Sequence, residues 1–231
     1  MDKLITSIPG MESFLRCRDL PASFWRGCGG KVLDDCLKMV SSSHDLGPYA
    51  TIINTFEDLE APILSKMRPH FPKLYTLGPL HALLSTVHRN GRSSSSNNSI
   101  FEVDRDCITW LDSQPSKSVV YVSFGSIVMM THKQMLEFWY GLVNSGKRFL
   151  WAIRPDSVID KDEKYQIPHE LTAGTEQRGY IVGWSPQEEV LAHPSIGGFL
   201  THSGWGSVLE SIIAGVPMLC WPQMGDHHIN S

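Results

Sequence analysis

The sequence predicts an α/β protein built on a doubly wound, parallel sheet. From residue 118 onward, short apolar segments of strand length alternate with helix-patterned segments, which is the element order of β-α-β units. Segment 118–124 is uninterrupted and apolar, as expected for a strand buried on both faces. The loop 201–207 is rich in small residues and joins a predicted strand to a predicted helix, and loops at that position hold ligands in this fold class.

Residues 1–80 predict an irregular start followed by one strand-helix-strand unit. A helix is expected over 24–40, after the breakers that precede it. The β-branched run 49–56 predicts a strand, and a short helix over 57–67 and a strand over 74–78 follow it.

Residues 81–117 predict a linker. The Ser- and Asn-rich stretch 88–99 has too few apolar side chains to join a buried core, so it is expected to form a loop. A short helix is expected over 106–111. We therefore place one domain before the linker, at 1–80, and a second after it, at 118–231.

The 118–231 region predicts several further elements. Residues 133–145 carry apolar side chains at helical spacing: Met135, Leu136, Trp139, Leu142 and Val143. The other expected elements are strands over 148–153, 179–183, 197–201 and 216–221, and helices over 188–192 and 208–214.

The bulk composition argues against several functional classes. The chain of 231 residues is 42% hydrophobic, which suffices for a buried core. A formal net charge of −4 without a basic stripe argues against nucleic-acid binding. Five cysteines without a C-x-x-C pair predict reduced thiols in the cytoplasm and no zinc site. The absence of a secretory h-region or an apolar span of about 20 residues predicts no stable membrane insertion.

The start of the last predicted helix supports two interpretations. Ser207 at its N-cap, with free backbone N–H groups beside it, would favour a phosphate group. The same Ser207 and Glu210 also match a capping box, which would explain both residues without a ligand. The local pattern alone leaves both interpretations open.

Other catalytic and cofactor motifs are incomplete here. Gly204 and Gly206 begin a dinucleotide-binding fingerprint, but Leu209 stands where its third glycine belongs. Ser203 lies outside the G-x-S-x-G pattern of a hydrolase elbow. The histidines around Asp226 lack the spacing of a helical metal site, so no metal is expected.

The run 184–227 as a whole resembles the signature box of plant UDP-dependent glycosyltransferases of family 1. The residues that stand at the spacings of that box are Trp184, Gln187, His202, Trp205, Ser207, Glu210 and Asp226. Further stretches similar to family landmarks are 8–12, 53–60, 77–79, 110–112 and 120–126. The stretch 8–21 is most similar to members that glucosylate iridoids and related terpenoids.

The resemblance implies the GT-B architecture, in which two Rossmann-like halves face each other. Residues 1–80 would then be the end of the acceptor-side half, and 118–231 the UDP-sugar-binding half without its final helices. The implied reaction is an inverting transfer of a hexose from UDP-glucose or UDP-galactose to a small hydrophobic plant metabolite. The UDP-sugar is a co-substrate, and no cofactor is implied.

The resemblance also implies roles for individual residues. Trp184 would stack on uracil, while Gln187 and Glu210 would bind the ribose. The residues implied to hold the diphosphate are Ser126, His202 and Ser207, and those implied to contact the sugar are Trp205, Asp226 and His227. Ser185 and Gly206 complete the nucleotide-sugar set.

Three residues depart from the family pattern. Gly206 replaces the usual asparagine, which removes one side-chain donor toward the phosphates, a loss of about 1–3 kcal/mol if nothing compensates. His227 replaces the usual glutamine, a change that accompanies galactose as donor sugar in some members. Ser203 replaces a cysteine, an exchange of one small side chain for another.

The resemblance implies no catalytic residue in this chain. The family base is a histidine near the N-terminus, oriented by an aspartate, and this sequence starts beyond both. We therefore expect a chain truncated at both ends. The prediction is a monomeric partial UDP-glycosyltransferase, and the alternative is a non-catalytic UDP-sugar-binding remnant.

Overall fold

The computed structural model describes residues 3–8, 11–20, 50–71, 73–83, 101–154, 156–159 and 178–231. The chain divides into two compact units, residues 1–94 with 224–230 and residues 95–223. The helix expected over 24–40 and the Ser/Asn-rich stretch 88–99 lie outside the described residues. The domain boundaries proposed at 80 and 118 stay a prediction.

The first unit contains the expected strand-helix-strand arrangement. β1 (Thr51–Ile53) pairs in parallel with β2 (Leu74–Thr76), and α2 (Glu57–Met67) connects them. Leu64 on α2 is buried. Nearer the N-terminus lies the short 3-10 helix η1 (Cys17–Asp19).

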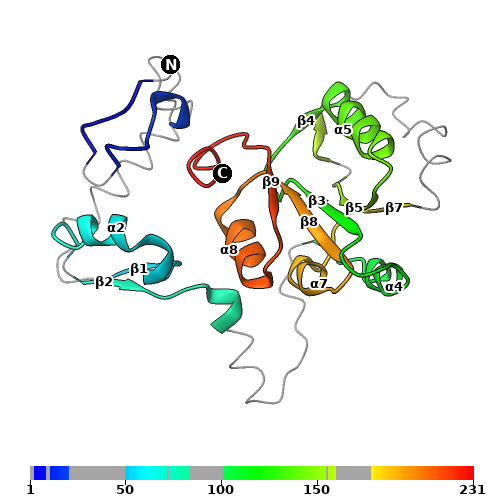
Figure 1. Cartoon of the computed structure of the whole chain (residues 1–231), viewed down its shortest axis with the longest axis horizontal. Coiled ribbons are helices and arrows are strands. Elements are labelled where there is room, and N and C mark those ends of the chain that lie inside the picture. The colour runs from blue at the N-terminus through cyan, green and yellow to red at the C-terminus, as the bar shows by residue number, and fades with distance from the viewer. Residues whose placement is uncertain are drawn as a thin grey trace. The chain divides into compact units, whose positions relative to one another are not determined.

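The second unit is built on a five-stranded parallel sheet (Figure 1). Its strands in chain order are β3 (Val119–Ser123), β5 (Arg148–Ala152), β7 (Gly179–Val182), β8 (Ile196–Thr201) and β9 (Met218–Cys220). Their spatial order is β7-β5-β3-β8-β9, and all pairs are parallel. The order of connections therefore reverses between β3 and β8, which confirms the predicted doubly wound sheet.

Helices cover both faces of this sheet. They are α4 (Asp106–Asp112), α5 (His132–Asn144), α7 (Gln187–Ala192) and α8 (Trp205–Ala214). A separate pair of short strands, β4 (Met130–Thr131) and β6 (Val158–Ile159), was not predicted. None of the helices in the described ranges combines the length and the hydropathy that crossing a bilayer requires.

The core lies on the two faces of the sheet because side chains alternate along each strand. On one face, Tyr121 of β3 belongs to a cluster with residues of α4 and α7. On the other face, Val122 belongs to a cluster that contains Trp139 of α5. Figure 1 shows α5 on one side of the sheet and α4 and α7 on the other. Because all five strands are parallel, their carboxyl ends lie at the same edge of the sheet.

Candidate functional site

The candidate site begins where the sheet reverses its order, at the ends of β3 and β8. Ser126 is exposed in the turn that follows β3, and His202 directly follows β8. The ring of His202 is flanked by two glycines: an added Cβ would lie 2.6 Å from its Nε2 at Gly125 and 2.4 Å from it at Gly204. Glycine at both positions therefore leaves room for the imidazole beside Ser126.

The turn from β8 into α8 uses an unusual backbone conformation. Ser203 is buried and has a φ of 66°, which is uncommon for a residue other than glycine. Its N–H donates to Thr201 Oγ1 at 3.2 Å. Helix α8 then begins at Trp205, so the N–H groups of its first turn lie next to His202 in the chain.

The N-cap prediction for Ser207 is wrong. The helix starts earlier than expected, with Gly204 at its N-cap, and Ser207 is its third residue. The side chains of Ser207 and Glu210 both accept hydrogen bonds from the amide nitrogen of Gln187, at 2.9 and 2.7 Å. A capping box therefore does not explain this pair.

Four predicted site residues meet around one buried tyrosine. The hydroxyl of Tyr121 donates to Gln187 Oε1 at 3.1 Å and lies 2.9 Å from Ser185 Oγ. Because Gln187 donates to Ser207 and Glu210 and accepts from Tyr121, its amide has one favourable orientation. The network thus joins the end of β7, helix α7 and helix α8 through Tyr121 of β3.

Burial sets the protonation of this network. Desolvation raises the pKa of Tyr121 far above its ordinary value, so the phenol remains a hydrogen-bond donor. Desolvation also raises the pKa of Glu210, and Glu188 adds to that rise, whereas the hydrogen bond from Gln187 opposes it. When ionised, the Glu210 carboxylate has lone pairs for further donors such as sugar hydroxyls.

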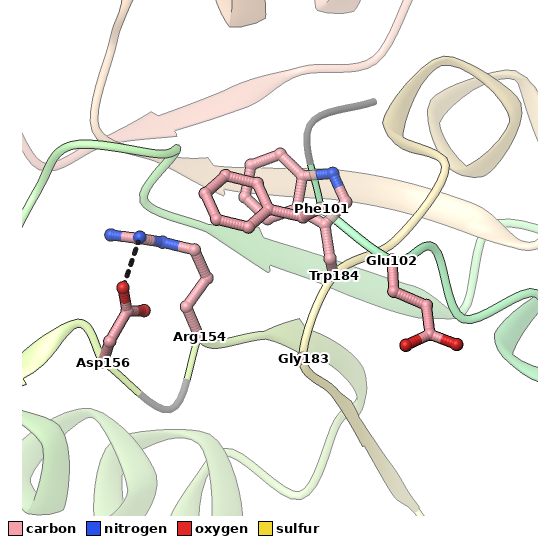
Figure 2. Close-up of a pocket in the computed structure, with 6 residues that line it drawn as sticks. All are labelled: Phe101, Glu102, Arg154, Asp156, Gly183 and Trp184. Atoms are coloured by element: carbon pink, nitrogen blue, oxygen red, sulfur yellow. Dashed lines mark hydrogen bonds and ion pairs between the residues drawn. The ribbon is translucent and has the colours of Figure 1, made fainter. Parts of the chain in front are cut away.

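A pocket of about 280 Å³ adjoins Trp184, just beyond the end of β7 (Figure 2). The indole of Trp184 packs against the ring of Phe101, with centroids 4.8 Å apart. The Arg154 guanidinium lies 5.2 Å from the centroid of Phe101 and pairs with Asp156 at 3.1 Å. The pocket is therefore bounded by two aromatic rings, one cation and the carboxylates of Glu102 and Asp156.

Two further predicted residues lie on the first turn of α8. Trp205 is half-buried and Gly206 is exposed. A Cβ added at Gly206 would meet no atom within 4 Å, so a larger side chain fits there.

Asp226 and His227 belong to the first unit. The Asp226 carboxylate accepts from Asn230 Nδ2 at 2.8 Å, and His227 Nδ1 accepts from the N–H of Met224 at 3.2 Å. Burial lowers the pKa of His227, an effect that Asp226 opposes. The predicted contacts of Asp226 and His227 with the sugar stay a prediction.

Sequence reasoning missed Tyr121, Phe101 and Arg154. A tyrosine within the apolar strand predicted over 118–124 was a usable signal, because a buried phenol requires a hydrogen-bond partner. Phe101 and Arg154 gave no comparable signal, since only the sheet order brings them beside Trp184.

A serine, a histidine and an aspartate are also linked at the start of β8. His193 lies 2.8 Å from Ser195 Oγ and 3.1 Å from Asp112 Oδ1. Ser195 is 1% exposed, so no substrate reaches its hydroxyl. These contacts tie the end of α4 to the sheet and do not form a hydrolase site. Within the described ranges, no group of three or more potential metal ligands occurs.

Comparison with known proteins identifies the family. The family model for UDP-glucoronosyl and UDP-glucosyl transferases matches residues 41–231. The chain is 55% identical to 7-deoxyloganetic acid glucosyltransferase from Catharanthus roseus, over 100% of the chain and 48% of that protein. It is 47% identical to myricetin 3-O-rhamnoside 1,2-glucosyltransferase from Crocosmia x crocosmiiflora, over 100% of the chain and 47% of that protein. The chain thus spans about half the length of these curated relatives.

Solved structures agree with this result. Os79 from O. sativa in complex with UDP superimposes with a TM-score of 0.80 at 31% identity, covering 97% of this chain and 48% of that one. An anthocyanidin 3-O-glucosyltransferase in complex with UDP gives a TM-score of 0.77 at 29% identity, covering 98% and 47%. The α/β fold of this chain is therefore that of the GT-B UDP-glycosyltransferases.

Proposed function

The chain belongs to the UDP-glucoronosyl and UDP-glucosyl transferase family, and on that basis we propose that its second unit binds the nucleotide of a UDP-sugar. The observation that carries the proposal is the network in which Gln187 orients Glu210 and Ser207. Glu210 and Gln187 would bind the ribose, and Trp184 would stack on uracil. Ser126, His202, Ser207 and the N-terminal turn of α8 would hold the diphosphate.

The spacing of the strands supports this assignment. Neighbouring strands lie about 4.8 Å apart, so the end of β7 is roughly 10 Å from the end of β3. The base corner at Trp184 and the phosphate corner at Ser126 follow those two strands. Gln187, which begins α7, is hydrogen-bonded to Tyr121 of β3 and to α8. A ribose at Gln187 would therefore lie between base and phosphates.

We further propose that this site serves hexosyl transfer to a small hydrophobic acceptor. The acceptor oxygen forms a bond to the anomeric carbon, the bond from that carbon to UDP breaks, and UDP leaves with the electron pair. The acceptor proton passes to a base, for which we assign no residue of this chain. Trp205, Asp226 and His227 would contact the sugar, which is glucose or galactose.

The names of two relatives support a proposal for the acceptor class. One of them is named for 7-deoxyloganetic acid and another for 7-deoxyloganetin, which favours an iridoid-like acceptor. We also propose that the protein is a monomer and that it is cytoplasmic, the latter in line with cysteines that form no C-x-x-C pair.

A second candidate function is UDP-sugar binding without turnover. It is favoured by the network of Gln187, Ser207 and Glu210, which would bind the nucleotide without requiring an acceptor. An assay of UDP release from UDP-glucose and from UDP-galactose, with and without 7-deoxyloganetic acid, separates the two functions. Acceptor-dependent release by this chain establishes the transferase. Binding of UDP without release establishes the second candidate, and absence of UDP binding overturns both.

A further inference from the structure

We propose that Phe101 and Arg154 are positioning residues for the indole of Trp184. Together they hold the surface on which the nucleobase is proposed to stack, so the inference rests on the proposed UDP site. None of the sequence patterns assigned a role to either residue. The proposal concerns the second unit alone, to which all three side chains belong.

Trp184 requires support because it stands on a connecting segment. It lies two residues beyond the end of β7 and is half-buried. The hydrogen bonds of the strand therefore do not fix the orientation of its side chain. A stacking surface that moves must be immobilised when a ligand binds, and this entropy loss weakens affinity. Phe101 supplies the support: the two rings are 4.8 Å apart between centroids, with an interplanar angle of 46°.

Arg154 holds Phe101 in turn. Its guanidinium carbon lies 5.2 Å from the centroid of the phenyl ring, within the range of a cation–π contact. The Arg154 side chain is 9% exposed, and Asp156 fixes its Nη1 at 3.1 Å. Figure 2 shows the guanidinium joined to Asp156 on one side of the ring of Phe101, whereas the carboxylate of Glu102 points away from the stack.

Backbone contacts keep this stack in register. The N–H of Asp104 donates to the carbonyl of Trp184 at 2.9 Å, so the segment that carries Phe101 is bonded directly to Trp184. Arg105, next along the chain, forms an ion pair with Glu189 of α7. Two contacts on the C-terminal side of Phe101 therefore hold its segment next to Trp184 and α7.

The three side chains come from three separate segments at the same sheet edge. Phe101 precedes α4, Arg154 follows β5, and Trp184 follows β7. All three line the 280 Å³ pocket together with Asp156. The stack thus forms one wall of the proposed base site, in which Trp184 touches the base and the other two hold Trp184.

A double-mutant cycle tests the inference. UDP affinity is measured by calorimetry for Phe101→Ala, Trp184→Ala and the double variant, with Phe101→Leu as a second variant that keeps the volume of the side chain. Phe101→Ala and Phe101→Leu, which remove the ring that packs on Trp184, are expected to weaken UDP binding about three- to tenfold. Phe101→Tyr keeps the ring and is expected to bind UDP as the unmodified chain does. In the Trp184→Ala background the Phe101 substitutions should have no further effect. Pyrophosphate, which has no base, should bind equally to all variants.

A second measurement needs no ligand. In chain labelled with 5-fluorotryptophan, the resonance of Trp184 is identified by its loss in Trp184→Phe. Phe101→Leu and Arg154→Gln should shift or broaden that resonance, while Tyr140→Ala on α5, a half-exposed aromatic, should not. An unchanged Trp184 resonance, or equal losses of UDP affinity in both backgrounds of the cycle, overturns the inference. If the unmodified chain does not bind UDP, the proposed function fails, and the resonance still decides whether the stack positions Trp184.

Discussion

The second unit has two pockets, and the smaller one lies at the proposed UDP site. The pocket beside Trp184 measures about 280 Å³. A groove of about 630 Å³ lies on the face of the sheet next to α5, where Val120, Leu200 and Leu219 form part of its lining. None of the predicted site residues lines the groove. The larger of the two is therefore not the proposed site.

Position and polar groups explain the difference. Ligands of doubly wound sheets bind beyond the carboxyl ends of the strands, and the smaller pocket lies there. Gln187, Ser207 and Glu210, which are joined by hydrogen bonds, belong to the helices that follow β7 and β8 from the same edge. The groove instead lies on a face of the parallel sheet, and helices normally cover such faces in α/β proteins. Volume alone thus does not locate a nucleotide site.

Removing one carboxylate from the proposed UDP site and one from the groove is expected to give the largest difference in UDP affinity. Glu210→Ala removes the proposed acceptor for the ribose hydroxyls and is expected to weaken UDP binding about 10- to 100-fold, since hydrogen bonds to charged groups contribute about 1.5–3 kcal/mol. Glu137→Ala, an exposed acid that lines the groove, is the control and should leave UDP affinity unchanged. Calorimetry measures both, and equal losses would remove the distinction between the regions.

A smaller effect is expected from one hydroxyl. Tyr121→Phe removes the hydroxyl that the buried Ser185 and the half-buried Gln187 share, so the unfolding free energy should fall by about 1–3 kcal/mol. Tyr140→Phe, on the half-exposed surface of α5, should change it by less than about 0.5 kcal/mol. Urea denaturation of both variants measures the difference, and a neutral Tyr121→Phe would show that the network does not hold the site.

A substitution at Gly206, in the proposed diphosphate site, is expected to strengthen UDP binding. Gly206→Asn adds a side-chain donor where an added Cβ meets no atom within 4 Å, and one new hydrogen bond of about 0.5–1.5 kcal/mol should strengthen UDP binding roughly two- to tenfold. Gly206→Ala is the control, since it improves the helix without adding a donor. Equal affinities of the two variants for UDP would place the diphosphate elsewhere.

The smallest effect is expected in the groove. Gly141 lies inside α5, and a Cβ added there meets nothing within 4 Å. Gly141→Ala should therefore raise the unfolding free energy by roughly 0.5–1 kcal/mol. Its UDP affinity should stay that of the unmodified chain. A loss of affinity in this variant would connect the groove to the nucleotide.

Local sequence predicted much of this fold. The helical spacing over 133–145 and the apolar run over 118–124 correspond to α5 and β3 within one or two residues, because burial of one stripe or of both faces dictates each pattern. The start of α8 was missed, since Gly204 caps the helix by its backbone and offers no side-chain signal. The short strands β4 and β6 carried no recognisable pattern either.

The site was less accessible to sequence reasoning. Trp184, Gln187 and Glu210 were picked out by their resemblance to a family box, and their proposed roles stay predictions. Their connection through Tyr121 depends on the order β7-β5-β3-β8, which no local pattern contains. The stack of Phe101 on Trp184 likewise joins segments far apart in the sequence.

The central claim is that UDP binds at the carboxyl edge of the sheet. Titration of the 15N-labelled chain with UDP, followed by amide NMR, tests it most directly. We predict the largest shifts at the Trp184 indole N–H, the Gln187 side-chain amide and the backbone N–H groups of residues 205–207. Shifts concentrated instead around Lys133, Leu219 and Trp221, which line the groove, would contradict the claim.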